Sequence, residues 1–161
     1  MNSLIVYETE FITASSIRIS SPRSESLWMA YRGLLGHEIR IAVYGGGRGG
    51  AFVREANPEQ VLLEVSDLGP SLPLQPIDLI VGLSRPQTIK KVIQLAVMTG
   101  VRSLHLVSTE RGEKSYVTTH ILDEKPLHNE VVKALEQTGE GKAPSISVHR
   151  SFAHFCRNGL R

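Results

Sequence analysis

The chain has 161 residues and a mass of 17.7 kDa, and 41% of its residues are hydrophobic while 21% are charged. These proportions are typical of a soluble globular protein of one or two small domains, and they exclude disordered and collagen-like chains. The longest apolar runs, such as residues 77–83, contain a charged residue and are far shorter than the roughly 20 apolar residues of a membrane-spanning helix. We therefore expect no integral membrane protein.

The charge is distributed unevenly along the chain. Residues 1–76 carry a net charge of −2, whereas residues 77–161 carry +4. The basic excess of the second half is compatible with a polyanionic partner, although solvated surfaces of the same charge are common. The amino terminus has neither the basic start nor the apolar run of a targeting signal, and the one cysteine, Cys156, excludes an intramolecular disulfide. We expect a cytoplasmic protein.

The first part of the chain has the pattern of a small β domain. Residues 38–44 alternate polar and apolar side chains, as a half-buried strand does. Shorter β-branched or apolar runs predict further strands at residues 3–7, 16–19, 51–54 and 60–65. A helix is predicted over residues 24–32, with Ser24 as its N-cap and with Leu27, Trp28 and Tyr31 on one side. Together these elements predict a small barrel or sandwich.

A proline-rich connector separates this region from a second one. Residues 69–76 contain three prolines, which favour an extended segment over a helix or a central strand. Beyond the connector, the apolar runs 78–83 and 103–107 flank a helix predicted over residues 86–99. This is the pattern of two parallel strands joined by a crossover helix.

The second region is expected to be an α/β domain with few strands. A later helix is predicted over residues 124–138, and a weak strand lies near residues 146–148. A parallel sheet covered on both faces normally needs more β-α units than this. We place the two domains at residues 1–72 and 77–161.

The segment Gly45-Gly46-Gly47-Arg48-Gly49-Gly50 invites comparison with nucleotide-binding loops, because glycines let backbone N–H groups approach a phosphate closely. A dinucleotide-binding loop joins a strand to a helix, however, and this segment lies between two predicted strands and lacks the Lys-Ser/Thr pair of a Walker loop. A flexible hairpin is therefore the favoured interpretation. Arg48 at its tip is a candidate contact for an RNA phosphate.

Metal binding and nucleophilic catalysis find little support in the sequence. His149, His154 and Cys156 follow an H-x4-H-x-C spacing, which is not a recognised tetrahedral zinc pattern and lacks a fourth ligand. His105 is expected to be a hydrogen-bonded strand residue rather than a general base, and no Ser-His-Asp arrangement can be assembled from the spacing. We expect neither a metal site nor a hydrolase, and the catalytic residues are unknown.

Three short segments of the second region form a more specific constellation, namely residues 82–94, 106–111 and 135–139. The first two include the carboxyl ends of the predicted parallel strands, which is the edge where open α/β sheets bind ligands. Arg85 and Arg111 would project at this edge, with Lys90 and Lys91 on the helix that follows the first strand. By spacing alone, ordinary solvated charges are the favoured explanation of Lys90, Lys91 and Arg111.

These segments, behind a small β domain, resemble the RsmE family of bacterial 16S rRNA uracil-N3 methyltransferases. Residues 32–41 and the glycine-rich hairpin are similar to stretches of that family's first domain, and residues 93–101 are similar to its helix ending in Glu-Leu-Gly-Val. Ser108-Thr109-Glu110-Arg111 resembles the family's Ser-Glu-Arg motif, and Glu136-Gln137-Thr138-Gly139 resembles its Glu-Gln-Ser/Thr-Gly motif.

The resemblance implies a small N-terminal PUA-like β-barrel that binds RNA, followed by an α/β domain of the SPOUT, or α/β-knot, type. It implies an active-site rim formed by Glu110, Glu136, Gln137 and Thr138. It also implies a set of cationic side chains that contact RNA, namely Arg32, Arg48, Arg85, Lys90, Lys91 and Arg111.

The chain departs from the family pattern at several positions. Glu140 stands where the family usually has an arginine, and Arg85-Pro86 and Leu127 also differ. The Gly-Pro-Glu-Gly-Gly and Leu-Gly-x-x-Ile-Leu-Arg-x-Glu-Thr segments, which form the family's knot and hold S-adenosylmethionine, have no counterpart in this sequence. No cofactor-binding residue is identified. We expect an incomplete SPOUT domain, truncated before the knot, that does not methylate by itself.

The implied activity is S-adenosylmethionine-dependent N3 methylation of a uridine in 16S rRNA. The implied partners are 16S rRNA or the small ribosomal subunit and a second copy of the chain in a homodimer, with no membrane. Two other classes stay open. One is a non-catalytic RNA-binding or ribosome-associated module that lacks the cofactor site, and the other is a small-molecule-binding α/β protein.

Overall fold

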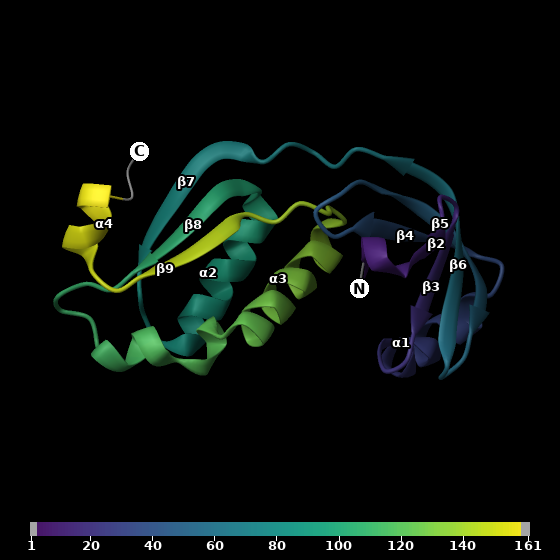
Figure 1. The fold of residues 1–161 in the computed structure, drawn as a ribbon, viewed down its shortest axis with the longest axis horizontal. Coiled ribbons are helices and arrows are strands. Elements are labelled where there is room, and N and C mark those ends of the chain that lie inside the picture. The colour runs from purple at the N-terminus through teal and green to yellow at the C-terminus, as the bar shows by residue number, and fades with distance from the viewer. Residues whose placement is uncertain (1–2, 159–161) are drawn as a thin grey trace. The chain divides into compact units, whose positions relative to one another are not determined.

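The computed structural model describes residues 3–158, and Figure 1 shows their helices and strands. The chain divides into two compact units, which are Met1–Leu72 with Glu136–Lys142, and Pro73–Leu135 with Ala143–Arg161. The return segment Glu136–Lys142, which the sequence places in the second domain, therefore belongs with the first unit. None of the helices within residues 3–158 is long and apolar enough to cross a bilayer.

The first unit is built on a six-stranded sheet with the strand order β1-β4-β5-β6-β3-β2. Its neighbouring strands are antiparallel except for β1 and β4, which are parallel. The strands are β1 (Leu4–Val6), β2 (Phe11–Thr13), β3 (Ser16–Ser20), β4 (Glu38–Val43), β5 (Arg48–Ala56) and β6 (Gln60–Gly69). Two short 3-10 helices, Glu8–Glu10 and Arg32–Leu34, complete the connections. The β character of this region is as predicted.

Helix α1 (Arg23–Tyr31) closes the core of the first unit with the side chains that the sequence indicated. Leu27 and Tyr31 are buried with the inward-facing residues of the strands, and Trp28 packs against the same cluster. The prediction that Ser24 caps this helix is wrong, because the N-cap is Pro22. Ser24 lies in the first turn, where its buried hydroxyl donates to the Pro58 carbonyl oxygen at 2.6 Å.

The glycine-rich segment joins strand to strand and not strand to helix: residues 45–47 form the turn after β4, and Arg48, Gly49 and Gly50 begin β5. Two of its glycines are required by close backbone approach. A Cβ on Gly49 would lie 2.0 Å from the carbonyl oxygen of Asp67 on β6, and one on Gly47 would lie 2.3 Å from that of Gly69. Real Cβ atoms do not approach backbone oxygens so closely, and these positions therefore exclude any side chain.

The second unit contains a parallel sheet with the strand order β7-β8-β9. Its elements are β7 (Gln75–Gly82), α2 (Pro86–Thr99), β8 (Val101–Val107), α3 (Glu124–Thr138, which reaches the first unit), β9 (Ser145–His149) and α4 (Phe152–Asn158). Two 3-10 turns, Lys114–Thr118 and His120–Leu122, lie between β8 and α3. The predicted crossover and both predicted helices are confirmed. Strand β7 begins before Pro76, a position that an edge strand tolerates because its outer N–H is not needed for pairing.

The two faces of the parallel sheet differ in polarity. Leu104 and Leu106 of β8 are fully buried, whereas Ser103 and His105 alternate with them and therefore point to the opposite face. Ile89, Ile93 and Ala96 form the buried stripe of α2. The apolar face of the sheet thus supplies the core of the unit, and the other face is free to carry polar groups.

We predict that replacing Gly49 with alanine destabilises the first unit by about 2–3 kcal/mol, because its methyl group would overlap the Asp67 carbonyl. Urea unfolding measured by circular dichroism gives this value. The control is Gly33→Ala, at a position with no atom within 4 Å of the added Cβ and with an ordinary backbone conformation. The control should change stability by less than about 1 kcal/mol, and equal effects of the two substitutions would contradict the steric explanation.

Candidate functional site

The parallel register brings the carboxyl ends of all three strands of the second unit to one edge. The N–H of Leu83, just after β7, donates to the Val107 carbonyl at the end of β8, with an N–O distance of 2.8 Å. The N–H of Ser108 donates to the His149 carbonyl at the end of β9, also at 2.8 Å. Backbone hydrogen bonds therefore hold the loops that follow the three strands side by side, as expected for the ligand-binding edge of an open α/β sheet.

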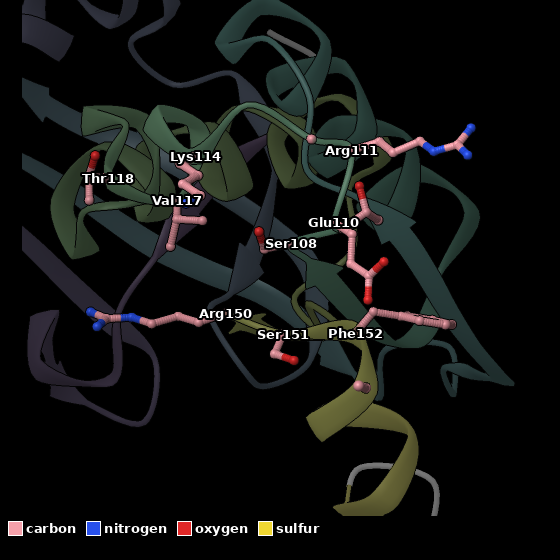
Figure 2. Close-up of a pocket in the computed structure, with 12 residues that line it drawn as sticks. Ser108, Glu110, Arg111, Lys114, Val117, Thr118, Arg150, Ser151 and Phe152 are labelled. Carbon is pink, nitrogen blue, oxygen red and sulfur yellow. The ribbon is translucent and has the colours of Figure 1, made fainter.

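A cavity of about 830 Å³ opens at this edge, between the segment after β8 and the turn from β9 to α4 (Figure 2). The segment after β8 contributes the Ser-Thr-Glu-Arg motif and the residues that follow it. The lining residues are Ser108, Thr109, Glu110, Arg111, Gly112, Lys114, Val117, Thr118, Arg150, Ser151, Phe152 and Ala153. The motif singled out in the sequence therefore does lie at a concave surface.

The charge of the cavity is positive. Its lining holds three cationic side chains, Arg111, Lys114 and Arg150, against one carboxylate, Glu110. Within residues 3–158, none of these three cations forms a salt bridge, so their charges are free to act on a ligand. Figure 2 shows the Arg111 side chain extending outward from the cavity, which suits a contact with a ligand larger than the cavity itself.

Arg85 lies near this edge although it does not line the cavity. Hydrogen bonds from Ser115 and Tyr116 lower the pKa of Glu113, and the positive charge of Arg85 adds to the shift. Arg85 follows β7 and Glu113 follows β8, and the hydrogen bond from Leu83 to Val107 holds the ends of these two strands together. The joint contact of Arg85 and Arg111 with one ligand stays a prediction.

The two lysines of α2 have different surroundings. Lys90 Nζ lies 3.7 Å from the carboxylate of Glu130 on α3, which also accepts hydrogen bonds from Gln94 and Lys133, both at 3.1 Å. Burial of Glu130 acts to raise its pKa, but Lys133, Gln94 and Lys90 outweigh it and lower the pKa. Lys90 thus neutralises a buried acid inside the unit, whereas Lys91 is exposed to solvent.

Of the predicted rim residues, Glu110 lines the cavity. Glu136, Gln137 and Thr138 are not among its lining residues; they form the last turn of α3 and belong to the first unit. The carbonyl of Glu136 accepts hydrogen bonds from the backbone N–H and hydroxyl of Ser3, at 3.0 and 3.1 Å. The role of these three residues at an active-site rim stays a prediction.

Arg48 and Glu140 form a salt bridge in the first unit. The second carboxylate oxygen of Glu140 accepts the N–H of Leu72 at 3.0 Å. Around this pair, Gly141 is tied to the hairpin by a bond from the Gly45 N–H to its carbonyl at 2.7 Å. The acid that replaces the family's usual arginine therefore has an internal partner, which is the arginine of the glycine-rich hairpin.

Arg32, the other arginine of this unit assigned to RNA from the sequence, has an aromatic neighbour. Its guanidinium carbon lies 5.1 Å from the centroid of the Trp28 ring. A cation at this distance from an indole face is held in a defined orientation. Arg32 follows α1 directly, so the helix positions the pair.

His105 is a hydrogen-bonded strand residue, as predicted. Its Nε2 lies 3.1 Å from Ser103 Oγ, and its Nδ1 lies 2.8 Å from Ser147 Oγ and 3.1 Å from His149 Nε2. The row continues to Asp78, whose pKa is lowered to about 2 by hydrogen bonds from Arg102 and Ser103. Burial lowers the pKa of His149, and the charges of His105 and His154 add to the shift. Within residues 3–158, no group of three or more His, Cys, Asp and Glu side chains is arranged to hold a metal ion.

Lys114, Arg150 and Phe152 are among the cavity residues that sequence reasoning missed. Lys114 lies in a 3-10 turn for which the sequence shows no recognisable pattern, and Arg150 follows the weakest of the predicted strands. Phe152 begins α4, a helix of seven residues without a predicted start signal. The only available signal was the position of Arg150 directly after a strand, the same criterion that selected Arg85.

The fold and the cavity define an α/β protein that presents cationic loops at the carboxyl edge of a parallel sheet, which is the class expected to bind a polyanion. The family model of the RNA methyltransferase domain matches residues 70–160, and the chain belongs to this family. A curated relative, the ribosomal RNA small subunit methyltransferase E of Treponema pallidum (strain Nichols), is 35% identical over 83 residues. The resemblance to the RsmE family drawn from the motifs is thereby confirmed.

The relatives are longer than the part of them that this chain matches. The match covers 52% of this chain and 31% of the Treponema protein. The crystal structure of ribosomal RNA small subunit methyltransferase E from Neisseria gonorrhoeae, bound to S-adenosyl methionine, has a TM-score of 0.66 and 18% identity, over 91% of this chain and 62% of that one. A predicted RNA methyltransferase from Thermotoga maritima has a TM-score of 0.64 and 14% identity, over 91% and 65%. These two structures show that the fold is shared.

We predict that Glu140→Arg destabilises the first unit by about 1–2 kcal/mol, because it removes the acceptor of the Leu72 N–H and places two cations together. The double variant with Arg48→Glu should recover part of the loss, since it restores opposite charges. Thermal unfolding of the single and double variants measures both effects.

The matched control for this prediction is Glu64→Arg, which reverses one charge of the exposed Arg54–Glu64 pair. Pairs at such exposed positions contribute little, so the control should cost less than about 0.5 kcal/mol. A loss of the same size in both variants would show that the Arg48–Glu140 pair has no special role.

Proposed function

We propose that the chain acts in the S-adenosylmethionine-dependent methylation of a uridine at N3 in 16S rRNA, and that the cavity after β8 and β9 is its RNA-binding site. One observation carries the proposal. The Ser-Thr-Glu-Arg motif of an RNA methyltransferase domain lines a concave surface together with three cations from two adjacent loops. An excess of free positive charge in a hollow suits the phosphates of RNA.

In this proposal, the first unit is a PUA-like RNA-binding barrel and the second is part of a SPOUT-type domain. Among the cations predicted from the sequence, Arg32, held over Trp28, and the outward-facing Arg111 and Lys91 have the freedom to meet RNA. Arg85 adds its field at the same edge as Arg111. Lys90 and Arg48 can contribute only in part, because Glu130 and Glu140 already neutralise them.

Methylation of uracil N3 requires an exposed base, loss of the N3 proton and a methyl donor in line with N3. S-adenosylmethionine, to which the Neisseria protein is bound, supplies the methyl group. The cavity itself does not fit this molecule, because a cationic sulfonium meets three cations and one carboxylate there. In this proposal, the residues that line this cavity bind and position the RNA, and the donor is held outside the cavity.

The proposed partners follow from the same family membership. The chain would bind 16S rRNA or the small ribosomal subunit in the cytoplasm and pair with a second copy as a homodimer. Light scattering at micromolar concentration distinguishes a dimer from a monomer. The alternative of a non-catalytic RNA-binding module would share the cavity and its cations, and it differs from the proposed function only in methyl transfer.

We predict that the double variant Arg111→Ala/Lys114→Ala binds 16S rRNA about tenfold more weakly and with a flatter salt dependence, because each lost phosphate contact lowers the salt slope by about 0.7–0.9. Filter binding over a series of salt concentrations measures both quantities. The control is Lys125→Ala/Lys142→Ala, which removes the same charge from exposed positions outside this cavity. An equal loss of RNA affinity in both variants would show that the protein attracts RNA nonspecifically, without a particular role for this cavity.

We predict that calorimetric titration of residues 1–161 with S-adenosylmethionine shows no binding at micromolar concentrations, because the cavity presents uncompensated positive charge. The comparison ligand is a short oligouridylate, which should release heat in the same buffer. Tight binding of S-adenosylmethionine would contradict the assignment of this cavity to RNA alone.

A further inference from the structure

The turn from β9 to α4 carries features that the proposed function does not use. Arg150, Ser151 and Phe152 line the cavity beside the Ser-Thr-Glu-Arg segment. None of the three belongs to a motif by which the sequence resembles its family. The turn thus places an arginine and an aromatic ring two residues apart at a cationic cavity. The two side chains suit different parts of a ligand.

This turn is held in place by backbone bonds and by a buried anchor. The carbonyl of Ser108 accepts the Phe152 N–H at 3.1 Å, while the N–H of Ser108 donates to His149. One helical turn later, Phe155 is only 1% exposed. Its ring packs on His149 and His105, with centroid distances of 4.6 and 5.1 Å. The position of Phe152 is therefore set from both sides of the turn.

Phe152 nevertheless leaves its ring in solvent. It is 51% exposed, in contrast to Phe155 on the same helix. An exposed phenyl ring loses the free energy that burial would provide, and its flat face matches that of a nucleobase. Aromatic rings at the surface of RNA-binding proteins stack on unpaired bases, and each such contact is sequence-tolerant because every base has a π face.

Arg150 is the cation of the same turn. It lies at the junction of the main cavity and a second hollow of about 240 Å³, which share Val117 and Thr118. Within residues 3–158, its guanidinium has no salt-bridge partner. Figure 2 shows its side chain extending in the direction opposite to the ring of Phe152. The two side chains can therefore contact different parts of one extended strand.

We propose that the β9–α4 turn is a nucleotide clamp for single-stranded RNA, in which Phe152 stacks on an unpaired base and Arg150 pairs with a phosphate of the same strand. The clamp rests on the proposed function, because it adds two specific contacts to the RNA-binding cavity. It also predicts the structural class of the RNA. A duplex keeps its bases stacked and cannot offer one to Phe152, whereas a loop or an unpaired strand can.

The test uses the full chain and a fluorescein-labelled oligouridylate, with binding followed by anisotropy over a range of salt concentrations. Phe152→Ala should weaken binding about tenfold without changing the salt slope, because stacking involves no counterion release. Phe152→Tyr should retain the affinity, while Phe152→Leu should not. Arg150→Ala should weaken binding and lower the salt slope by about 0.7, the value for one phosphate of a single strand.

Two control variants match these substitutions. Leu95→Ala removes an apolar side chain on α2 that is 57% exposed, and Lys125→Ala removes an exposed cation. Neither should alter the affinity. A duplex of the same length should bind the wild type and Phe152→Ala equally. Unfolding temperatures of all variants confirm that the turn keeps its structure, since Phe155 is untouched.

The outcomes separate the clamp from the function on which it rests. Suppose that the wild type binds the oligouridylate and that Arg111→Ala/Lys114→Ala weakens this binding. If Phe152→Ala or Arg150→Ala then leaves the affinity unchanged, the clamp is wrong and the proposed cationic cavity stands. If Phe152→Leu binds as well as Phe152→Tyr, the ring does not stack and the clamp is overturned. If the wild type binds no RNA in a salt-dependent way, both proposals fail.

Discussion

Parallel pairing of β7, β8 and β9 is the constraint on which the candidate site depends. Parallel strands end at the same edge, so loops that are far apart in the sequence become neighbours there. The hydrogen bonds of Ser108, to His149 on one side and from Phe152 on the other, fasten two of these loops directly. Arg111 and Arg150, almost forty residues apart in the chain, consequently line one cavity. No single stretch of sequence contains the site, and the register of the sheet creates it.

Internal acids divide the cations of this protein into two groups. Lys90 and Arg48 face Glu130 and Glu140, so much of their charge is compensated within the protein. Arg111, Lys114 and Arg150 at the sheet edge form no salt bridge within residues 3–158, and Glu110 is the one carboxylate that lines their cavity. A count of lysines and arginines therefore overstates the charge available to a polyanionic ligand, because cations beside a buried acid are already compensated. Glu140 illustrates this point, since it looks like a charge reversal in the sequence but is one half of a salt bridge in the structure.

Local sequence patterns predicted the elements well where periodicity was strong. The bounds of α2 and α3 agree with the expected ranges, because each combines a regular apolar stripe with a clear stop, Gly100 in the first case and Gly139 in the second. The patterns failed where geometry is set at a distance. Ser24 resembles an N-cap, but its hydroxyl is captured by the carbonyl of Pro58, thirty-four residues away. The members of the cavity were missed for the same reason, since the turns carrying them are short and aperiodic and only the tertiary fold brings them together.

The return of Glu136–Lys142 to the first unit has a consequence for dividing this protein into parts. The chain leaves the first unit after Leu72, comes back for seven residues and leaves again. Within that unit, Ser71 donates to the Gly46 carbonyl and accepts the Gly141 N–H, and the Gly45 N–H relies on the Gly141 carbonyl. A fragment that ends at the proline-rich connector would keep every strand of the first unit. It would lose the segment Glu136–Lys142, whose Gly141 is hydrogen-bonded to the turn between β4 and β5. Each unit is thus built from two separate segments of the chain, so a single cleavage could release neither of them intact.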